Sequence, residues 1–427
     1  ARQQSAEASA LISNPILKDK KQRLEAERIR ALAEKRIALL KNEKTKGESV
    51  SEFYLFRYLA SEGFLPGYNF TRLPVRAFLG DKGDNVVISR PRAIAIKEFG
   101  PHNRIYYNGS KYMVNRCMLH TGTEVPGHSP DTPGSRMRSL KVCTNTGYAF
   151  VDDDAKGKNQ DPVTGLSLTA ADFNLFGSLI ELHEVVTEST ERITCMEEIR
   201  AGEGYEIDTY FSTADDLKSA LVTRLSFEGD QLMKLFFAPA AQVIYLNRKY
   251  RREREAGFLI GTRTGFLKTQ AQAENKNAKE ESVRAMFFTY DTTDILYIQP
   301  VKALNLTEEG VITMQYALQR GVQEHFHIEQ DEIAATLMGG KENKNLMLLE
   351  SAQGSLGILK ELAKSPAKLQ AVFRMAYAIC GFDPVTRTDK YPERPKASYD
   401  DLLSYYNQPY HPVIDRHSVK AALELLI

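Results

Sequence analysis

The sequence predicts an α+β protein: a charged N-terminal helix, a β-rich middle module and a C-terminal α/β layer rich in helices. Two patterns carry this prediction. Alternating apolar and polar residues, which are typical of strands, recur between residues 86 and 299. Apolar residues spaced three and four apart, which are typical of amphipathic helices, prevail after residue 310.

Size and composition narrow the class of protein. A chain of 427 residues suggests roughly two or three domains, and 42% hydrophobic residues suffice for a folded core. The 56 Lys and Arg against 55 Asp and Glu leave a net charge of +1, so any attraction to nucleic acid must come from a local basic surface. We expect boundaries at 1–50 (a linker or docking helix), 51–150 (β-rich), 151–302 (mixed α+β) and 303–427 (helical).

Other features concern the cell compartment. No apolar run is long enough to span a membrane, and no signal peptide is recognisable, so a cytoplasmic protein without membrane contact is expected. The chain opens in polar residues without a methionine, which suggests a processed chain or a piece of a longer one. Its cysteines are widely separated, which favours buried thiols over disulfides or a zinc knuckle; they are Cys117, Cys143, Cys195 and Cys380.

The first two modules begin with helices. One helix is expected over residues 15–46, where eleven Lys or Arg and five Asp or Glu between Lys18 and Lys46 give a local charge of about +6. This charged helix could contact phosphates, but a solvated linker helix is the preferred interpretation. Asn108-Gly109 is typical of a type I′ hairpin turn. The other elements expected before residue 150 are a helix over 52–61, strands over 86–88, 92–99, 104–107 and 111–115, and a loop over 120–135.

The remaining elements follow from the same patterns. Between residues 151 and 302 we expect a loop (152–165), helices (175–186 and 191–200), strands (204–212, 220–227, 232–246 and 284–299) and a mobile loop (270–281). After residue 303 we expect helices (311–322, 328–338, 354–362, 367–378, 400–406 and 417–427) and one strand (346–349).

Catalytic motifs are missing from the sequence. No phosphate-binding loop of the form G-x-x-x-x-G-K-[ST] occurs, and Gly339-Gly340-Lys341 lacks the first glycine of that pattern. The chain alone is therefore not expected to hydrolyse ATP. His325 and His327, with Glu324, Glu329 and Asp331 nearby, would supply half of a metal site, but surface or capping roles are favoured. Capping and packing are likewise favoured for His411, His417 and Asp415 over acid–base catalysis.

The sharpest basic cluster is the segment NRKYRRER at residues 247–254. Arginine next to an aromatic residue is typical of surfaces that track a phosphate backbone and stack bases. A solvated turn after a strand at 242–246 is the alternative, and the sequence leaves the two open. The nucleic-acid contacts that we predict are Arg248, Lys249, Tyr250, Arg251 and Arg252, then Arg90 and Arg92. Arg136, Arg138 and Lys141 complete a weaker basic set.

Two segments resemble a known family. FLPGYNF, within residues 51–78, and SYYNQPYHPVIDRH at the end of residues 398–417 resemble the C-terminal zinc-binding region of large bacterial MrfA-type superfamily 2 helicases, which also occurs in the DISARM and Druantia phage-defence systems. The resemblance implies an accessory region that binds DNA and docks on a helicase motor. ATP and Mg²⁺ would then belong to the motor, in the same polypeptide or a separate subunit, and other defence proteins would be partners.

One departure from the family pattern concerns the metal. The family places cysteines just before L-L-S-Y, where this chain has Ser398 and Asp401, so no zinc is expected. Apolar packing of the residues around Leu402 and Ile414 would replace it. Two rival hypotheses remain: a scaffold that joins a helicase to a nuclease or methylase without touching DNA, and a metal-dependent nuclease that uses His325 and His327.

Overall fold

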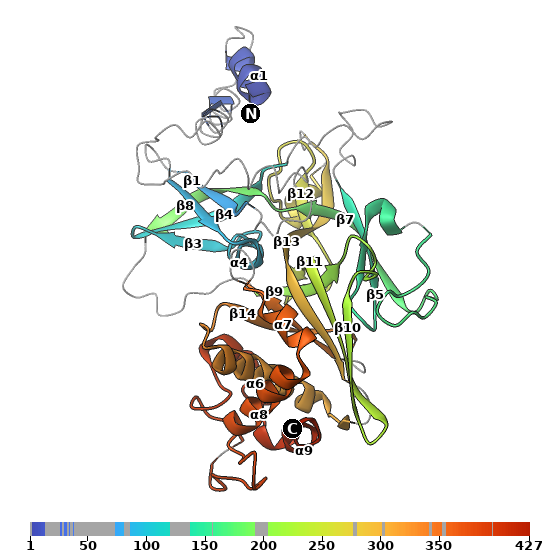
Figure 1. The fold of residues 1–427 in the computed structure, drawn as a ribbon. Helices are drawn as coiled ribbons and strands as arrows, with labels where there is room; N and C mark the ends of the chain where they lie inside the picture. The colour runs from blue at the N-terminus through green and yellow to red at the C-terminus, as the bar shows by residue number, and fades with distance from the viewer. Residues whose placement is uncertain are drawn as a thin grey trace.

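The computed structural model describes a two-sheet protein with a helical C-terminal layer (Figure 1), and it confirms the α+β class. The described residues are 2–12, 26–27, 30–31, 34, 37, 73–80, 86–119, 137–155, 157–192, 204–275, 280–300, 304–340, 344–351, 356–394 and 396–427. Helix α1 covers Arg2–Ile12. Most of the helix predicted at 15–46, the helix at 52–61, the FLPGYNF segment and the loop at 120–135 lie outside these ranges.

The smaller sheet has five strands in the order β2-β1-β8-β4-β3. Asn108 and Gly109 both have positive φ, 49° and 75°, and join Tyr107 to Ser110, so the type I′ hairpin is confirmed. The strands are β1 Val75–Gly80, β2 Val86–Arg90, β3 Arg104–Tyr107, β4 Ser110–Cys117 and β8 Glu184–Arg192.

Residues 92–99, predicted as a strand, instead form helix α4, Arg92–Glu98, ending at Phe99. The alternation Ala-Ile-Ala-Ile misled the prediction, because alanine and lysine favour helices. The buried residues Ala95, Ile96 and Phe99 are spaced as one helical face, and they pack between the two sheets.

The larger sheet is built around two long strands, β11 and β13, in the order β10-β11-β13-β7-β5-β6. Strands β9, β12, β14 and β15 pair beside this path. The strands predicted at 204–212, 220–227, 232–246, 284–299 and 346–349 are confirmed. The bounds are β5 Arg138–Cys143, β6 Ala149–Val151, β7 Phe173–Glu181, β9 Tyr205–Ser212, β10 Leu221–Phe227, β11 Asp230–Tyr250, β12 Phe258–Gly261, β13 Ser282–Pro300, β14 Ile333–Met338 and β15 Asn345–Glu350.

A bulge interrupts the pairing of β11 with β13. Ala240 has a φ of 48°, and its amide donates to Asp294 Oδ1 at 2.9 Å. Pro239, which has no amide hydrogen, lies in the same bulge, where the ladder has no bond for it to break. The bulge lets one strand serve two regions, because β11 pairs with β10 before it and with β9 after it.

The helix predicted at 175–186 is wrong, because this segment forms β7 and β8. β7 pairs with β5 and β13 in the large sheet, whereas β8 pairs with β1 and β4 in the small one. The chain changes sheets at Leu182 and His183, so the buried positions lose the regular alternation of a strand. The charged helix predicted at 191–200 is wrong at its start, which is the end of β8; residues 193–200 lie outside the described residues.

The C-terminal layer covers the ends of β11, β13 and β15 with helices (Figure 1). The helices predicted at 311–322, 354–362, 367–378 and 417–427 are confirmed, as α6 Glu308–Phe326, α7 Ile358–Lys364, α8 Pro366–Ile379 and α9 Lys420–Leu426, the last preceded by a 3₁₀ turn, Arg416–Val419. The segment 328–338 is strand β14 and not a helix. Residues 400–406 form turns that run into a 3₁₀ helix, Tyr405–Tyr410, and not an α-helix.

Two smaller points complete the fold. The loop predicted at 270–281 starts with a one-turn helix, α5 Gln270–Ala273, capped by Thr269, and residues 276–279 lie outside the described residues. No helix in the described ranges combines the length and apolarity that a membrane crossing needs. The large sheet takes strands from all three modules predicted after residue 50, whose boundaries stay a prediction.

Candidate nucleic-acid interface

The basic cluster straddles the end of β11 and the turn that leads to β12. Residues 247–250 continue β11, with Tyr250 opposite Tyr205 of β9, and residues 251–257 form the turn. The turn is closed by a hydrogen bond from Gly257 N to Arg248 O at 2.6 Å. Gly257 has a φ of 91°, and a Cβ there would lie 2.8 Å from Arg284 Cγ, so only glycine fits.

Tyr250 anchors this turn to the turn that follows helix α4. Its hydroxyl donates to Pro101 O at 3.1 Å, and Tyr205 donates to the same carbonyl at 2.7 Å. Its ring meets Phe258 edge-on, with 4.8 Å between the ring centroids. These contacts hold the turn in place, so they compete with the base-stacking role predicted for Tyr250.

Arg248 and Lys249 are partly neutralised by carboxylates of β9. Arg248 lies 3.1 Å from Glu206 and 2.7 Å from Asp208; the second contact is ionic and lacks the alignment of a hydrogen bond. Lys249 Nζ lies 3.5 Å from Glu206. A phosphate that approached these two side chains would have to displace existing ion pairs.

The exposed cations lie further along, on the turn itself. Arg251 is exposed, and its Nε donates to Tyr205 O at 3.2 Å. Arg252 and Arg254 are exposed, and neither forms an ion pair or hydrogen bond with any described residue. The sequence analysis did not single out Arg254, although it closes the segment NRKYRRER. Three arginines on an anchored turn are thus turned towards solvent.

Arg90 and Arg92 are placed very differently from one another. Arg90 is exposed and pairs with Glu98 at 2.8 Å. Arg92 is only 4% exposed, and its guanidinium donates to Glu181 at 2.8 Å and to Leu73 O at 2.9 Å. A guanidinium that is buried and paired in this way cannot reach a phosphate. Arg92 is therefore not among the DNA contacts that we propose.

Arg92 instead belongs to a buried polar network at the junction of the sheets. Burial alone would raise the pKa of the Glu181 carboxyl, but the hydrogen bond and charge of His183 and the charge of Arg92 outweigh it and hold that pKa well below its usual range. Within the weaker basic set, Arg138 lies 3.6 Å from Asp152, Lys141 is buried, and Arg136 lies outside the described residues.

The positions that would carry zinc-binding cysteines bond to each other. Ser398 Oγ donates to Asp401 Oδ2 at 2.9 Å, and the Ser398 amide donates to Oδ1 at 2.7 Å. Asp401 is buried, as is the nearby Cys380, whose pKa burial and the charge of Asp401 raise to about 12. A hydroxyl and one carboxylate without a thiolate do not fit the nitrogen and sulfur donors of a structural zinc.

The remaining candidate residues have local structural contacts. His327 ends α6 in the left-handed conformation, and the His325 ring packs on Phe326. Asp415 accepts a bond from the His417 amide, which is the predicted capping role. Across the described ranges, no group of three or more His, Cys, Asp or Glu side chains is arranged to hold a metal. Buried thiols are confirmed for Cys117, Cys143 and Cys380; Cys195 lies outside the described residues.

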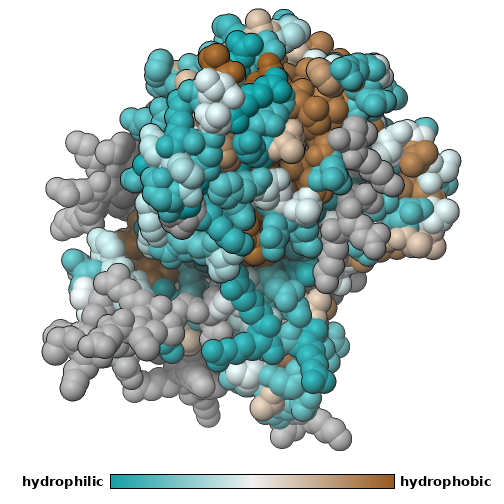
Figure 2. Space-filling model, turned by 90° about the horizontal axis from the view of Figure 1, so that it is seen from below, coloured by the Kyte–Doolittle hydropathy of each residue, from teal (hydrophilic) through white to brown (hydrophobic). Residues whose placement is uncertain are grey.

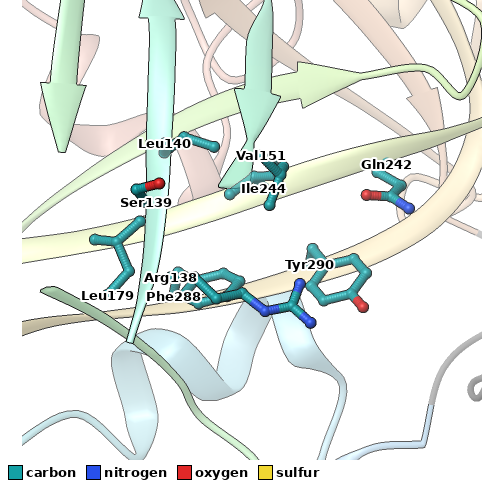
Figure 3. Close-up of a pocket in the computed structure, with 9 residues that line it drawn as sticks. All are labelled: Arg138, Ser139, Leu140, Val151, Leu179, Gln242, Ile244, Phe288 and Tyr290. Carbon is teal, nitrogen blue, oxygen red and sulfur yellow. The ribbon is translucent and has the colours of Figure 1, made fainter. Parts of the chain in front are cut away.

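A small hollow lies between β5, β6, β7 and the two long strands (Figure 3). Its walls are mostly apolar, with the Arg138 guanidinium and the Tyr290 ring close together at one side. The hollow encloses about 10 Å³, which is roughly the room of one water molecule. It is therefore far too small for a nucleotide. The lining residues are Arg138, Ser139, Leu140, Val151, Leu179, Gln242, Ile244, Phe288 and Tyr290.

Comparison with known proteins yields likenesses to solved structures alone. No family model matches the chain, and no curated protein matches it. It is similar to a crystal structure of the DUF1998 helicase MrfA bound to DNA, with 10% identity and a TM-score of 0.37 over 93% of this chain and 39% of that one. It is similar also to a crystal structure of MrfA bound to DNA and AMPPNP, with 9% identity and a TM-score of 0.25 over 79% of this chain and 30% of that one. It is also similar to a crystal structure of the DUF1998 helicase MrfA, with 8% identity and a TM-score of 0.28 over 80% of this chain and 33% of that one.

These similarities are limited both in coverage and in TM-score. The chain spans 30 to 39% of the length of the structures that it matches. TM-scores below 0.5 do not establish a common fold. The function proposed below is therefore based on the sequence and the geometry of this chain.

Proposed function

We propose that this chain is an accessory DNA-binding and motor-docking region of a bacterial superfamily 2 helicase of the phage-defence type, cytoplasmic and without its own ATPase centre. Two sequence features support the proposal: the segments that resemble the MrfA-type region, and the missing phosphate-binding loop. The structural observation that carries the DNA-binding part is the anchored turn with Arg251, Arg252 and Arg254 exposed.

The turn is the part of the cluster best suited to phosphate. A cation without a partner gains a phosphate and releases a DNA counterion without giving up an ion pair. Arg252 and Arg254 meet this condition, and Arg251 gives up no charged partner. Arg248 and Lys249 would contribute by exchanging Glu206 and Asp208 for phosphate, at the cost of the pairs they now make. No described contact joins Arg90 to the turn, so it would be a separate, secondary contact.

Binding of labelled duplex DNA to the purified chain, followed by fluorescence anisotropy at low salt, tests this proposal. The variant with Arg251, Arg252 and Arg254 all changed to Gln should lose most of its affinity. The matched control changes Lys360, Lys364 and Arg374 to Gln, which are exposed and remove the same charge from α7 and α8. Equal losses in both variants, or no binding by the native chain, would remove the DNA role.

A scaffold without DNA contact is the second candidate function. The observation that favours it is the presence of four carboxylates around the turn: Glu206 and Asp208, which pair with Arg248, and Glu253 and Glu255, of which Glu255 pairs with Arg284 at 3.0 Å. Retention of a helicase motor by the chain, together with a lack of DNA binding at low salt, would favour the scaffold.

A further inference from the structure

Strand β10 ends the large sheet with one edge open. It pairs with β11 and with no other strand of the described residues. Such an edge presents backbone N–H and C=O groups that can recruit a further strand. Figure 1 shows β10 and the start of β11 as a hairpin that projects beside the helical layer.

The edge of β14, by contrast, is covered. Three glutamines of α6, spaced four apart, donate their side-chain amides to backbone carbonyls of β14 and of the turn before it: Gln315 to Ala335 at 3.0 Å, Gln319 to Ile333 at 2.9 Å and Gln323 to Gln330, in the turn, at 3.0 Å. The contact between β10 and the end of α7 uses a side chain, Thr223 Oγ1 to Ala363 O at 2.7 Å, and occupies no backbone group of β10.

β10 also exposes large apolar side chains. Leu221, Val222 and Phe227 are 37, 39 and 47% exposed. The strand contains no proline, which is one device by which natural edges avoid pairing, and Arg224 is its one charged residue. On the face seen from below in Figure 2, hydrophobic side chains gather in patches within a largely hydrophilic surface.

The single charge of β10, Arg224, has no counter-charge among the residues that the structure describes. Arg224 lies directly opposite Lys234 of β11, and like charges in that position repel. Burial and, after it, the charge of Arg224 lower the pKa of Lys234. No carboxylate among the described residues pairs with Arg224, so a negative group brought to this position would relieve the repulsion. Val222 lies two residues away and hence on the same face.

We propose that β10 is a docking edge for an extended segment of a partner protein. The segment adds as a further strand and places an apolar residue opposite Val222 and an Asp or Glu opposite Arg224. Exposed apolar side chains beside the cation favour a polypeptide over a nucleic acid. A second copy paired antiparallel about Arg224 is disfavoured, because it would set two arginines opposite each other.

This edge is independent of the basic turn. Residues 234 and 250 are separated by roughly 50 Å along β11 at the usual rise of a strand. A chain that fails to bind DNA would therefore not contradict the docking edge, and a chain that fails to bind the peptide would not contradict the DNA contacts.

A phage-displayed library of random nonapeptides, panned against the full chain, tests the proposal. Enriched peptides should carry an apolar residue and an Asp or Glu two positions apart. The best peptide should bind Arg224→Glu and Val222→Asn more weakly, by up to about five-fold, since a cross-strand pair is worth up to about 1 kcal/mol. Leu175→Asn, at a position 70% exposed on β7, is the matched control and should bind normally.

A fold readout separates lost docking from lost structure. Arg224→Glu should raise the thermal midpoint, because the new carboxylate faces Lys234. Four results would overturn the proposal: no enriched peptide; enriched peptides that bind Arg224→Glu as well as the native chain; weaker binding of duplex DNA by Arg224→Glu with peptide binding intact; or self-association of the chain that Arg224→Glu abolishes.

Discussion

Arg416 is the bulkiest fully buried side chain among the described residues. Its guanidinium donates to both carboxylate oxygens of Asp389, at 2.9 and 2.8 Å, and to the carbonyls of Cys380 and Tyr391. It therefore ties the 3₁₀ turn before α9 to the loop that follows α8. The sequence shows the motif that contains Arg416, but it gives no sign that the partner lies 27 residues upstream.

Arg416→Gln should lower the free energy of unfolding by about 1.5–3 kcal/mol, because it removes the charge-assisted hydrogen bonds of a buried guanidinium to the half-buried Asp389 carboxylate. Urea unfolding followed by circular dichroism measures this. Lys368→Gln, which breaks an exposed ion pair with Glu361, is the control and should cost at most about 1 kcal/mol. A similar small loss in both variants would show that the buried pair has no special role.

Asp383 makes the same loop sensitive to acid. The backbone amides of Thr386 and Val385 donate to its carboxylate, and with Lys390 they lower its pKa to about 2. A folded pKa below the unfolded value of about 3.9 stabilises the loop above pH 4, and this stabilisation disappears as the pH falls towards 2. Carboxyl ¹³C shifts should show Asp383 titrating near pH 2; a midpoint near 3.9 would contradict the assignment.

Residue roles were predictable where chemistry is local. Capping by Asp415 and the burial of the thiols follow from residue type and neighbours. Tyr250 and Arg92 show the limit, because their partners, Pro101 and Glu181, are far away in the sequence and come close only when the sheets form. A run of basic and aromatic residues thus predicts a binding surface, but it does not show which of these residues instead make structural contacts within the protein.

At the scale of elements, the glutamines of α6 act as a unit that covers the edge of β14. Changing Gln315, Gln319 and Gln323 together to Leu should leave three backbone carbonyls unbonded and cost about 1 kcal/mol for each bond. Urea unfolding and hydrogen exchange in β15 would report the loss. Gln408→Leu, at an exposed position, is the control. An unchanged free energy of unfolding would mean that the ladder does not stabilise the edge.

Helices and strands were predictable when one buried face runs along their whole length, because the spacing of their apolar residues is then regular from end to end. The β3–β4 hairpin and α6 meet this condition, since a single turn type or a single buried face fixed the sequence. The strands β7 and β8 do not, because the chain leaves one sheet for the other at Leu182, and the spacing of apolar residues then imitates a helix. The edge strand β14 was mistaken for a helix, although its β-branched Ile333 and Thr336 favour a strand.

For the whole molecule, the α+β class was predictable from periodicity, whereas the joining of distant strands into one sheet was not. β15 pairs with β13, and β13 with β11, across intervening helices and loops. The sequence placed the basic cluster next to a strand correctly, but the strand runs on to Tyr250 and contains half of the cluster, rather than ending at residue 246. The division of the cluster into neutralised strand residues and exposed turn residues depends on β9, whose Glu206 and Asp208 have no signature in the sequence.

The proposed function requires that the turn of Arg251, Arg252 and Arg254 contacts the phosphates of DNA. The salt dependence of duplex binding measures this contact. The three arginines together should contribute about −2.7 to the slope of the logarithm of the binding constant against the logarithm of salt concentration, so each Arg→Gln change should make the slope shallower by about 0.9. A slope near zero in the native chain, or an unchanged slope after all three changes, would contradict the proposal.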